Sequence, residues 1–313
     1  MRIVVLGAGG IGGFAAAALA RAGYDVAVVA RGPHLDAIRT RGLHVRSVLG
    51  EFTVRVPASD RLAELGTFDL AIAGFKAHQW ADALEQLAPA AHEGLTIVTL
   101  QNGVPFWFAR TPPLESVDPG GRIGALFPDA QTIGGVVHAS GHIPEPGSIR
   151  QSGRARYLFG DAAGGAGDRV RELCEMFRVA GMEPEPDENI RATVWLKLVN
   201  NAGLNPVSTL RGVTVHRMLE DPAAFAEVRE LMLEAIAVGR ALGAIENVDV
   251  EDRLAALSSI ADVKTSMLQD FEAGRKLETG PILGALIELA GRCGVRVPLA
   301  CAAEAALEAK ARC

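Results

Sequence analysis

A glycine-rich string near the N-terminus constrains the fold of this chain more than any other feature of its sequence. Gly7-Ala8-Gly9-Gly10-Ile11-Gly12 directly follows the apolar run at residues 2–6 and opens an apolar helical pattern at residues 11–22. A strand, a tight glycine turn and a helix in this order are typical of a fold in which parallel strands alternate with helices. The string therefore predicts an α/β fold, with the turn at the carboxyl end of the first strand.

The spacing of the glycines also predicts what the turn binds. Gly7 permits the tight turn, Gly9 lets a pyrophosphate approach the backbone, and Gly12 allows the helix to pack closely on the strand. The phosphates would then face the positive end of the helix dipole. We predict a dinucleotide site whose cofactor-binding residues include Gly7, Ala8, Gly9, Gly10, Ile11 and Gly12.

The end of the second predicted strand favours one form of the cofactor. NAD-preferring sites of this type place an acidic residue there to bond the ribose 2′-hydroxyl. In this chain the strand ends at Ala30-Arg31, and the nearby acid, Asp25, lies at its beginning. Because a guanidinium pairs well with a phosphate, Arg31 predicts NADP(H) rather than NAD(H), with a solvated surface arginine as the alternative.

The first half of the chain alternates β-branched runs with amphipathic helical patterns, which favours a parallel sheet with helices on both faces. Strands are expected at residues 2–6, 25–30, 69–74 and 95–100, and helices at residues 11–22, 79–87 and 168–180. Residues 43–48 and 51–56 predict an inserted antiparallel hairpin. Residues 133–160 are expected to finish the sheet with short antiparallel strands, and the glycine-rich residues 160–167 predict a flexible surface loop.

A charged run with two prolines marks the predicted domain boundary. Residues 183–188, Glu-Pro-Glu-Pro-Asp-Glu, cannot continue a helix and keep the chain extended. Beyond them, helical patterns follow at residues 190–204, 223–242, 250–257, 266–273, 282–293 and 299–311. We predict an N-terminal Rossmann-type dinucleotide-binding domain over residues 1–187 and an all-α domain over residues 188–313, with the substrate cleft between them.

Length and charge exclude several classes of protein. The chain has 313 residues, and its 31 basic and 37 acidic side chains give a formal net charge of −6. These charges are spread along the chain and offer no footprint for nucleic acid or an anionic membrane. No uninterrupted apolar run reaches the ~18 residues that suggest a membrane span. Glycines also interrupt the N-terminal segment that imitates a secretory signal, so a cytoplasmic protein is expected.

The cysteines and histidines predict no metal site. The seven histidines form no cluster, and the four cysteines include no CxxC pair and no repeated spacing. Reduced thiols in a cytosolic protein are expected at these four positions, which are Cys174, Cys293, Cys301 and Cys313.

Two polar segments follow predicted strands at the same edge of the sheet. Lys76 comes after the strand at residues 69–74 and Phe75, and Gln101-Asn102-Gly103 comes after the strand at residues 95–100. Ligands of open α/β sheets gather at the carboxyl ends of the strands, so both segments should share a rim with the glycine turn. Taken singly, a surface lysine and an ordinary turn explain them equally well. Their convergence makes Lys76 and Asn102 candidate ligand-binding residues.

A polar stripe runs along a helix that is otherwise apolar. Lys197, Asn201 and Asn205 are four residues apart, so each step drifts only about 40° around a helix. Apolar neighbours would bury most of this helix, and a buried polar group without a partner costs about 1–3 kcal/mol. A polar ligand is therefore expected against the stripe, although Lys197 could instead extend to solvent from a helix end.

Five segments of the sequence resemble the ketopantoate reductase (2-dehydropantoate 2-reductase) family. The first matching segment is shared by many dehydrogenases, whereas the last two are much more specific. The segments cover nearly the whole chain in the order of the family: Gly7 to Gly12, Phe75-Lys76-Ala77-His78-Gln79, Gln101-Asn102-Gly103, Trp195-Leu196-Lys197 continuing to Asn201 and Asn205-Pro206, and Ser266-Met267-Leu268-Gln269-Asp270 followed by Glu278.

The resemblance implies reduction of a 2-oxo acid, foremost ketopantoate, to a 2-hydroxy acid with NADPH. It implies that Lys197 is the general acid for the carbonyl oxygen, with Glu278 beside it. An ammonium in that place would stabilise the forming alkoxide and protonate it. Burial would lower the pKa of the amine, and Glu278 would oppose that shift. Substrate-binding roles are implied for Asn201, Asn205, Ser266, Lys76 and Asn102, and cofactor-binding roles also for Lys76, Gln79 and Asn102.

Two details qualify the implied site. Ser266 and Glu278 are twelve residues apart and can converge only if the helix breaks between them, which Gly274 permits. Family members commonly have a substrate-facing asparagine where an ungapped reading places Val215. This difference reflects either a local gap in that reading or a paralogue that reduces a different branched 2-oxo acid. An NADPH-sensing protein without catalysis is a separate alternative. The helix expected at residues 223–242 could pack within its domain or against a second chain, which leaves a homodimer open.

Overall fold

The computed structural model of the chain describes residues 1–257 and 262–312. They form two compact units, which we call the sheet unit, residues 1–101 with 121–190, and the helical unit, residues 102–120 with the described residues from 191 onward. The sequence pattern did not predict that residues 102–120 belong with the helices. The domain limits predicted at residues 187 and 188 stay a prediction.

The sheet unit is built on one twisted sheet of ten strands. The strands are β1 (Arg2–Leu6), β2 (Asp25–Val29), β3 (Leu43–Ser47), β4 (Gly50–Val54), β5 (Ala58–Ser59), β6 (Leu70–Ala73), β7 (Thr96–Thr99), β8 (Thr132–His142), β9 (Ser148–Asp161) and β10 (Glu183–Pro186). Their order is β4-β3-β9-β8-β7-β6-β1-β2-β5, with β10 beside β9. Only the pairs β3–β4 and β8–β9 are antiparallel among these strands.

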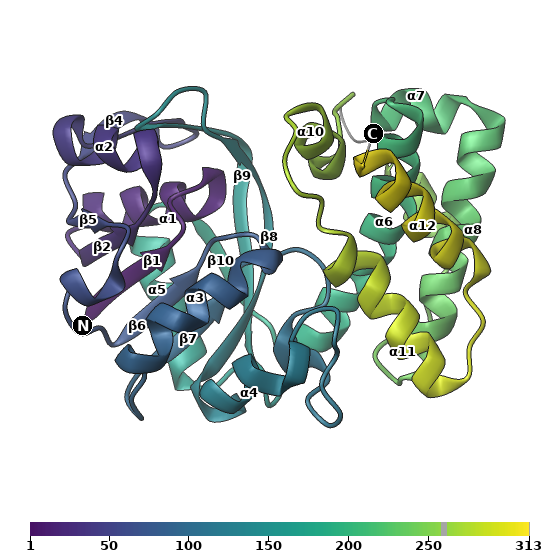
Figure 1. Ribbon diagram of the computed structural model, residues 1–313, viewed down its shortest axis with the longest axis horizontal. Helices are drawn as coiled ribbons and strands as arrows, with labels where there is room; N and C mark the ends of the chain where they lie inside the picture. Colours follow the sequence, from purple (N-terminus) through teal and green to yellow (C-terminus); the bar gives the residue numbers. More distant parts are fainter. Residues whose placement is uncertain (258–261, 313) are drawn as a thin grey trace. The chain divides into compact units, whose positions relative to one another are not determined.

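Helices cover both faces of this sheet, as predicted. They are α1 (Gly10–Arg21), α2 (Gly32–Arg41), α3 (Trp80–Leu87), α4 (Arg122–Leu126) and α5 (Asp168–Val179). Because β1 lies between β2 and β6, the crossover through α1 runs toward one edge and the crossover through α3 toward the other. Right-handed crossovers then place α1 and α3 on opposite faces, and α3 can be followed beside β6 and β7 in Figure 1.

The core of the sheet unit lies between α1, α5 and the strands. Phe14 and Leu19 of α1 are buried with three aromatic side chains that touch one another. Tyr157 stacks on Phe159 at 5.9 Å, and Phe177 of α5 meets Phe159 edge to face at 4.9 Å. Such aromatic pairs add about 0.5–1.5 kcal/mol each beyond the burial of their area. This core fixes the position of α1, and with it the glycine turn at its N-terminus.

Four details of the sheet unit differ from the prediction. The proline run at residues 183–188 is extended as expected, but its first four residues form β10, which is tolerated because β10 pairs only with β9. β8 and β9 are long strands of 11 and 14 residues, where short ones were predicted. The expected surface loop begins inside β9 and continues as a turn in which Gly164 N–H donates to the Asp161 carbonyl at 2.8 Å. Helix α2, which begins at a Gly-Pro pair, was not predicted.

The helical unit contains the helices that follow the sheet. They are α6 (Ile190–Arg211), α7 (Val215–Glu220), α8 (Pro222–Ala241), α9 (Val250–Leu257), α10 (Ser266–Glu272), a π-helical turn η7 (Gly280–Gly284), α11 (Ala285–Cys293) and α12 (Pro298–Ala311). α7 was not predicted. α6 was expected to end at residue 204, but it continues past Pro206 because residues 202–209 are buried and packing outweighs the missing proline N–H. No helix in the described residues is both long and apolar enough to span a bilayer.

The segment 102–120 supplies buried aromatic side chains to the helical unit. Phe106, Trp107 and Phe108 are all at most 3% exposed. Phe108 lies 5.4 Å from Trp195 of α6, and the guanidinium of Arg191 lies over the Phe108 ring at 4.3 Å. These contacts make the segment part of the core that holds α6.

Candidate active site

The glycine turn of the sheet unit has the geometry that its spacing predicts. Gly7 has φ +91°, and a Cβ there would lie 2.9 Å from Cβ of Phe75. A Cβ at Gly12 would collide with the carbonyl oxygen of Gly7, so α1 packs tightly on the strand end. A Cβ at Gly9, in contrast, would have no heavy atom within 4 Å. Gly9 thus leaves open space beside the N-terminus of α1, where no side chain caps the helix.

The other residues of the turn are held from within the sheet unit. A Cβ at Gly10 would collide with the backbone of Gly141 in β8, so this glycine is required by packing. The carbonyl of Ala8 accepts a hydrogen bond from His34 Nε2 at 2.8 Å, and Gly147 N–H donates to His34 Nδ1 at 2.9 Å. Because Gly147 N–H can only donate, His34 is neutral in this arrangement, and burial lowers its pKa. The turn is therefore rigidly supported.

Arg31 lies at the end of β2, as expected, and occupies the N-cap position of α2. Its side chain is about half exposed and its Nη1 lies 2.9 Å from Oδ2 of Asp82 in α3. This carboxylate was not anticipated as a partner. A phosphate bound by Arg31 would therefore compete with an ion pair that already exists, although exposed pairs of this kind are worth only about 0–1 kcal/mol.

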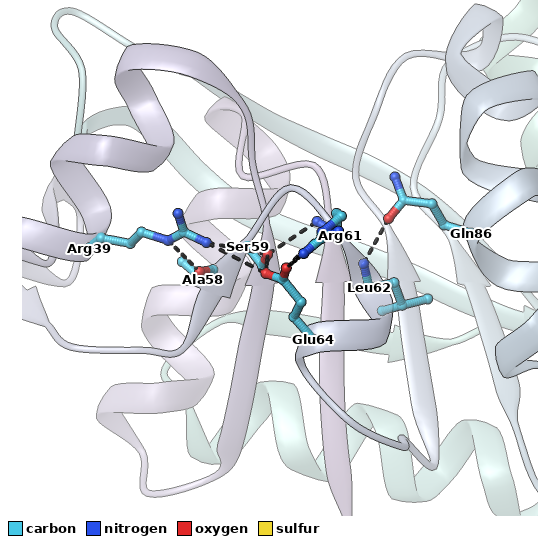
Figure 2. A network of polar contacts seen from close by, with 7 residues as sticks. All are labelled: Arg39, Ala58, Ser59, Arg61, Leu62, Glu64 and Gln86. Carbon is cyan, nitrogen blue, oxygen red and sulfur yellow. Dashed lines mark hydrogen bonds and ion pairs between the residues drawn. The ribbon is translucent and has the colours of Figure 1, made fainter.

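A polar network fixes the strand edge beside β2 (Figure 2). The hydroxyl of Ser59 donates to Glu64 Oε2 at 2.5 Å and accepts from the backbone N–H of Arg61 at 3.1 Å. The Ser59 bond, with Arg61, holds the pKa of Glu64 below its usual value. Arg39 donates to the Ser59 hydroxyl at 3.3 Å, and Ala30 N–H bonds the Ser59 carbonyl at 3.0 Å. Arg39 and Arg61 thus serve the network, while Arg31 projects from the adjacent strand end.

The rim at β6 and β7 contains five residues in one cluster. Lys76 N–H donates to Gln79 Oε1 at 2.9 Å, so the Gln79 side chain closes the turn that leads into α3. Phe75 meets Trp80 edge to face at 4.9 Å. Trp80 Nε1–H in turn donates to Gln101 Oε1 at 3.2 Å. The segments after β6 and β7 therefore converge at the strand ends, next to Gly7.

In the helical unit, α6 is anchored two residues before Lys197. Trp195 is fully buried and its indole N–H donates to the Ala235 carbonyl of α8 at 2.9 Å. Gly239 leaves the space that this indole fills, because a Cβ there would collide with it. This contact fixes the rotation of α6, and so the direction in which Lys197 and the residues four and eight positions later project.

Lys197 and Glu278 are coupled within the helical unit. Burial lowers the pKa of Lys197 to about 8, and the carboxylate of Glu278 acts in the opposite direction. Glu278 is itself 5% exposed. It follows α10, which ends at Glu272, and Gly274 has φ +63°, so the predicted helix break is confirmed. The break returns the chain so that a buried carboxylate acts on the amine.

Two buried amide groups continue the stripe from Lys197. Asn205 is 4% exposed and Asn201 is partly buried. The Nδ2 atoms of both are buried and have no hydrogen-bond partner among the described residues. Leaving such a donor unpaired costs about 1–3 kcal/mol, which a bound acceptor oxygen would recover. The stripe thus presents an amine and two unsatisfied N–H donors.

The remaining predicted residues lie at element ends. Ser266 is exposed and is the first residue of α10, and the hydroxyl of the N-cap residue Thr265 accepts a hydrogen bond from Leu268 N–H at 3.2 Å. Asn102 precedes Gly103, which has φ +81° and packs against the backbone of Pro281. Asn102 therefore lies in the helical unit near the start of η7, which begins two residues after Glu278.

Comparison with known proteins identifies the family. The family model of ketopantoate reductase PanE/ApbA matches residues 3–164, and that of its C-terminal region matches residues 189–311. A 2-dehydropantoate 2-reductase of Mesorhizobium japonicum is 38% identical, covering 92% of this chain and 91% of the relative. The chain belongs to the ketopantoate reductase family.

Solved structures of ketopantoate reductases share the whole fold. The 2-dehydropantoate 2-reductase of Geobacter metallireducens superposes with a TM-score of 0.89 at 31% identity, covering 99% of each chain. That of Methylococcus capsulatus gives a TM-score of 0.85 at 32% identity, covering 99% of this chain and 96% of the other. The predicted fold class, a Rossmann-type domain followed by an all-α domain, is confirmed.

For this ketopantoate reductase family member, each unit gathers part of the predicted site. The sheet unit holds the glycine turn, Arg31, Lys76 and Gln79, whereas the helical unit holds Lys197, Glu278, Asn201, Asn205, Ser266 and Asn102. The predicted rim shared by Lys76 and Asn102 and the cleft between domains stay predictions. Cys174, Cys293 and Cys301 are free thiols, and Cys313 lies outside the described residues. In the described part of the chain, no group of three metal-ligating side chains occurs.

Three residues that support the rim were not predicted from the sequence. His34 holds the glycine turn through Ala8, and Trp80 orients Gln101. Gln101 stood inside a recognised segment but received no role. Its position directly after a strand was a usable signal, whereas His34 and Trp80 act through contacts 26 and 21 residues away in sequence, which no local pattern reveals.

Proposed function

We propose that this protein reduces 2-dehydropantoate to the corresponding 2-hydroxy acid with NADPH. Membership of the ketopantoate reductase family supports the reaction class. The single observation that carries the proposal in this chain is the stripe in α6, where a partly buried amine precedes two buried amide donors without partners. Such donors fit the oxygens of a small 2-oxo acid.

The residues of the helical unit divide the work on the substrate. Lys197 donates its proton to the carbonyl oxygen as negative charge develops there, which both stabilises the charge and completes the alcohol. Glu278 keeps the amine charged by opposing the effect of burial on its pKa. Asn201 and Asn205 donate N–H groups to the carboxylate or carbonyl oxygens, and Asn102 and Ser266 are assigned to the same substrate. Binding the substrate would satisfy amide donors that are otherwise unpaired.

The residues of the sheet unit fit a dinucleotide. Gly9 leaves open space at an uncapped helix N-terminus, where backbone N–H groups bind pyrophosphate. A bound nicotinamide dinucleotide supplies the hydride. Lys76 and Gln79 are assigned to its nicotinamide side, and Arg31 at the end of β2 is assigned to the 2′-phosphate of NADPH.

A second candidate substrate follows from Val215. This residue stands where family members commonly have an asparagine, and it is 4% exposed at the start of α7. Its backbone N–H bonds the Val263 carbonyl at 2.9 Å, so the local structure uses the backbone rather than a polar side chain. An apolar side chain favours a 2-oxo acid with less polar substitution than 2-dehydropantoate.

A panel assay tests the proposal and separates the two substrates. Steady-state oxidation of NADPH and NADH is measured with 2-dehydropantoate, 2-oxoisovalerate, pyruvate and phenylglyoxylate. The proposal expects the highest kcat/KM with 2-dehydropantoate. A higher value with 2-oxoisovalerate or phenylglyoxylate supports the apolar alternative. Tight NADPH binding without turnover of any acid would refute the enzyme and support a sensing protein.

The cofactor assignment has its own test in Arg31 and Asp82. Arg31→Ala is expected to raise the KM for NADPH about tenfold or more and to leave the KM for NADH within about twofold, because only NADPH carries the 2′-phosphate. Asp82→Asn removes the competing carboxylate and should lower the KM for NADPH. If Arg31→Ala changes both cofactors equally, the assignment of NADP(H) to Arg31 is wrong.

A further inference from the structure

The amide of Gln101 has a fixed orientation in the sheet unit. Trp80 Nε1–H lies 3.2 Å from Gln101 Oε1. An indole N–H can only donate, so the amide oxygen must face Trp80 and the NH₂ group must point the other way. Trp80 is 4% exposed and is itself held edge to face by Phe75, which limits its freedom to move away.

The NH₂ group of the Gln101 amide has no hydrogen-bond partner among the described residues. Gln101 Nε2, the nitrogen of this group, is buried. A buried donor without an acceptor is disfavoured, and nearly all such groups in proteins have a partner. The orientation imposed by Trp80 therefore aims a donor at a position where an acceptor oxygen from outside the chain is expected.

The sheet topology says which part of a dinucleotide lies there. The pyrophosphate site is the turn after β1, and Arg31 after β2 marks the adenosine side. Gln101 follows β7, which lies on the opposite side of β1, two strands away in the order β7-β6-β1-β2. Neighbouring strands are about 4.8 Å apart, so Gln101 lies roughly 10 Å from β1 along the row of strand ends. The contact between Gly7 and Phe75 keeps that row continuous.

We infer that Gln101 is a cofactor-binding residue whose Nε2 donates to an acceptor oxygen on the nicotinamide riboside half of the dinucleotide, and that Trp80 is the positioning residue that orients it. The inference rests on the dinucleotide site assigned under the proposed function. The Gln101 contact would be made by the nicotinamide riboside half of the dinucleotide and not by the adenosine half.

The direct test is Gln101→Glu. The carboxylate still accepts from Trp80 but replaces the donor with a negatively charged acceptor. Dissociation constants are measured by fluorescence or calorimetry for NADPH and for 2′,5′-ADP, which lacks the nicotinamide half. Gln101→Glu is expected to raise the dissociation constant of NADPH about tenfold or more. The dissociation constant of 2′,5′-ADP should stay within about twofold of the wild-type value. Gln101→Met, which is uncharged, should weaken NADPH about threefold to tenfold.

The chain offers a matched control in Gln86. Its Oε1 also accepts from one N–H, that of Leu62 at 2.7 Å, and it lies in α3 of the same unit (Figure 2). Gln86→Glu makes the same chemical change near the C-terminal end of α3, whereas Trp80, the partner of Gln101, is the first residue of that helix. Both constants should stay within about twofold of the wild type. If Gln86→Glu also lowers the affinity for NADPH tenfold, the effect of Gln101→Glu is caused by added charge and the inference is overturned.

The role of Trp80 is tested with Trp80→Phe, which keeps an aromatic ring and removes the N–H. Trp80→Phe alone should raise the dissociation constant of NADPH about twofold to fivefold, because the Gln101 amide is no longer oriented. Combined with Gln101→Met, it should add less than about twofold, since the group it orients is already gone. Independent, multiplicative losses would show that Trp80 does not act through Gln101.

The outcomes separate this inference from the proposed function. If the wild type binds NADPH and reduces 2-oxo acids while Gln101→Glu leaves NADPH binding unchanged, the inference fails and the proposed function stands. Equal weakening of NADPH and 2′,5′-ADP also overturns it. If the wild type binds NADPH without reducing any acid, the proposed reaction fails and the Gln101 result is still read from the binding constants. A wild type that binds no dinucleotide refutes both.

Discussion

The glycine turn and the α6 stripe present chemistry in opposite ways. The turn works through missing side chains, because Gly7 and Gly12 permit close backbone packing and Gly9 leaves open space. The stripe works through side chains, because Lys197, Asn201 and Asn205 carry the amine and the amide donors. A site made of backbone is damaged by any added atom, whereas a site made of side chains is damaged by removing one functional group. The two sites should therefore respond differently to substitution.

Lys197→Met gives the largest expected effect on this comparison. The change keeps the length of the side chain and removes the amine, so kcat should fall about 10²–10⁴-fold while NADPH binding is retained. Steady-state kinetics and a binding titration measure the two quantities. Lys264→Met is the control, because Lys264 forms an exposed ion pair with Glu272 at 2.7 Å. If kcat falls equally in Lys197→Met and Lys264→Met, Lys197 has no specific role in the reaction.

Two alanine substitutions sharpen the contrast inside the turn. Gly12→Ala introduces a Cβ that collides with the Gly7 carbonyl, so we expect a lower melting temperature, with about 1–3 kcal/mol of stability lost. Gly9→Ala meets no atom within 4 Å and has φ −71°, so the melting temperature should not change, while the Kd for NADPH rises about tenfold or more. Unchanged NADPH affinity in Gly9→Ala would mean that no phosphate approaches this backbone.

Asn205→Leu tests the opposite behaviour in the stripe. It removes a buried amide donor that has no partner and replaces it with an apolar side chain of similar volume. Melting temperature without ligand should stay equal or rise, whereas KM for the 2-oxo acid should rise about tenfold. A large loss of stability with unchanged KM would show that the amide serves the fold rather than the substrate.

The pH dependence gives the smallest but most diagnostic effect. Lys197 must be protonated to act as an acid, and its pKa is about 8, so kcat/KM for reduction should be constant below that pH and fall about tenfold per unit above it. Glu278 raises this pKa, so Glu278→Gln should move the falling limb to lower pH. A limb that does not move, or moves to higher pH, would contradict the coupling between these two groups.

Local patterns predicted the parts of the molecule that depend on neighbours in sequence. The glycine turn follows from spacing alone, and the stripe follows from the helical repeat, since Lys197 and Asn201 share a face wherever α6 packs. The helix break at Gly274 was also predicted from local conformational preference, and the structure confirms it.

The rest depends on contacts that no local pattern contains. Glu278 was assigned only through the resemblance, because nothing in its own surroundings indicates that it acts on a lysine 81 positions earlier. The Asp82 partner of Arg31 and the Trp80 partner of Gln101 arise from the packing of α3 beside the strand ends. The place of residues 102–120 was missed for the same reason, since three aromatic side chains in a loop do not reveal which core they fill.

The insertion of residues 102–120 has a consequence for making hybrids of related reductases. Glu288 of α11 accepts from the backbone of Glu115 and Ser116 at 2.9 and 2.6 Å, and Arg292 donates to the Pro112 carbonyl at 2.7 Å. A chimera joined once near residue 188 would combine α11 from one parent with its aromatic insert from the other. Exchange of the whole helical unit needs three junctions, one before residue 102, one after residue 120 and one before residue 191. Recombinants with a single crossover should therefore be less stable unless these contacts match between the parents.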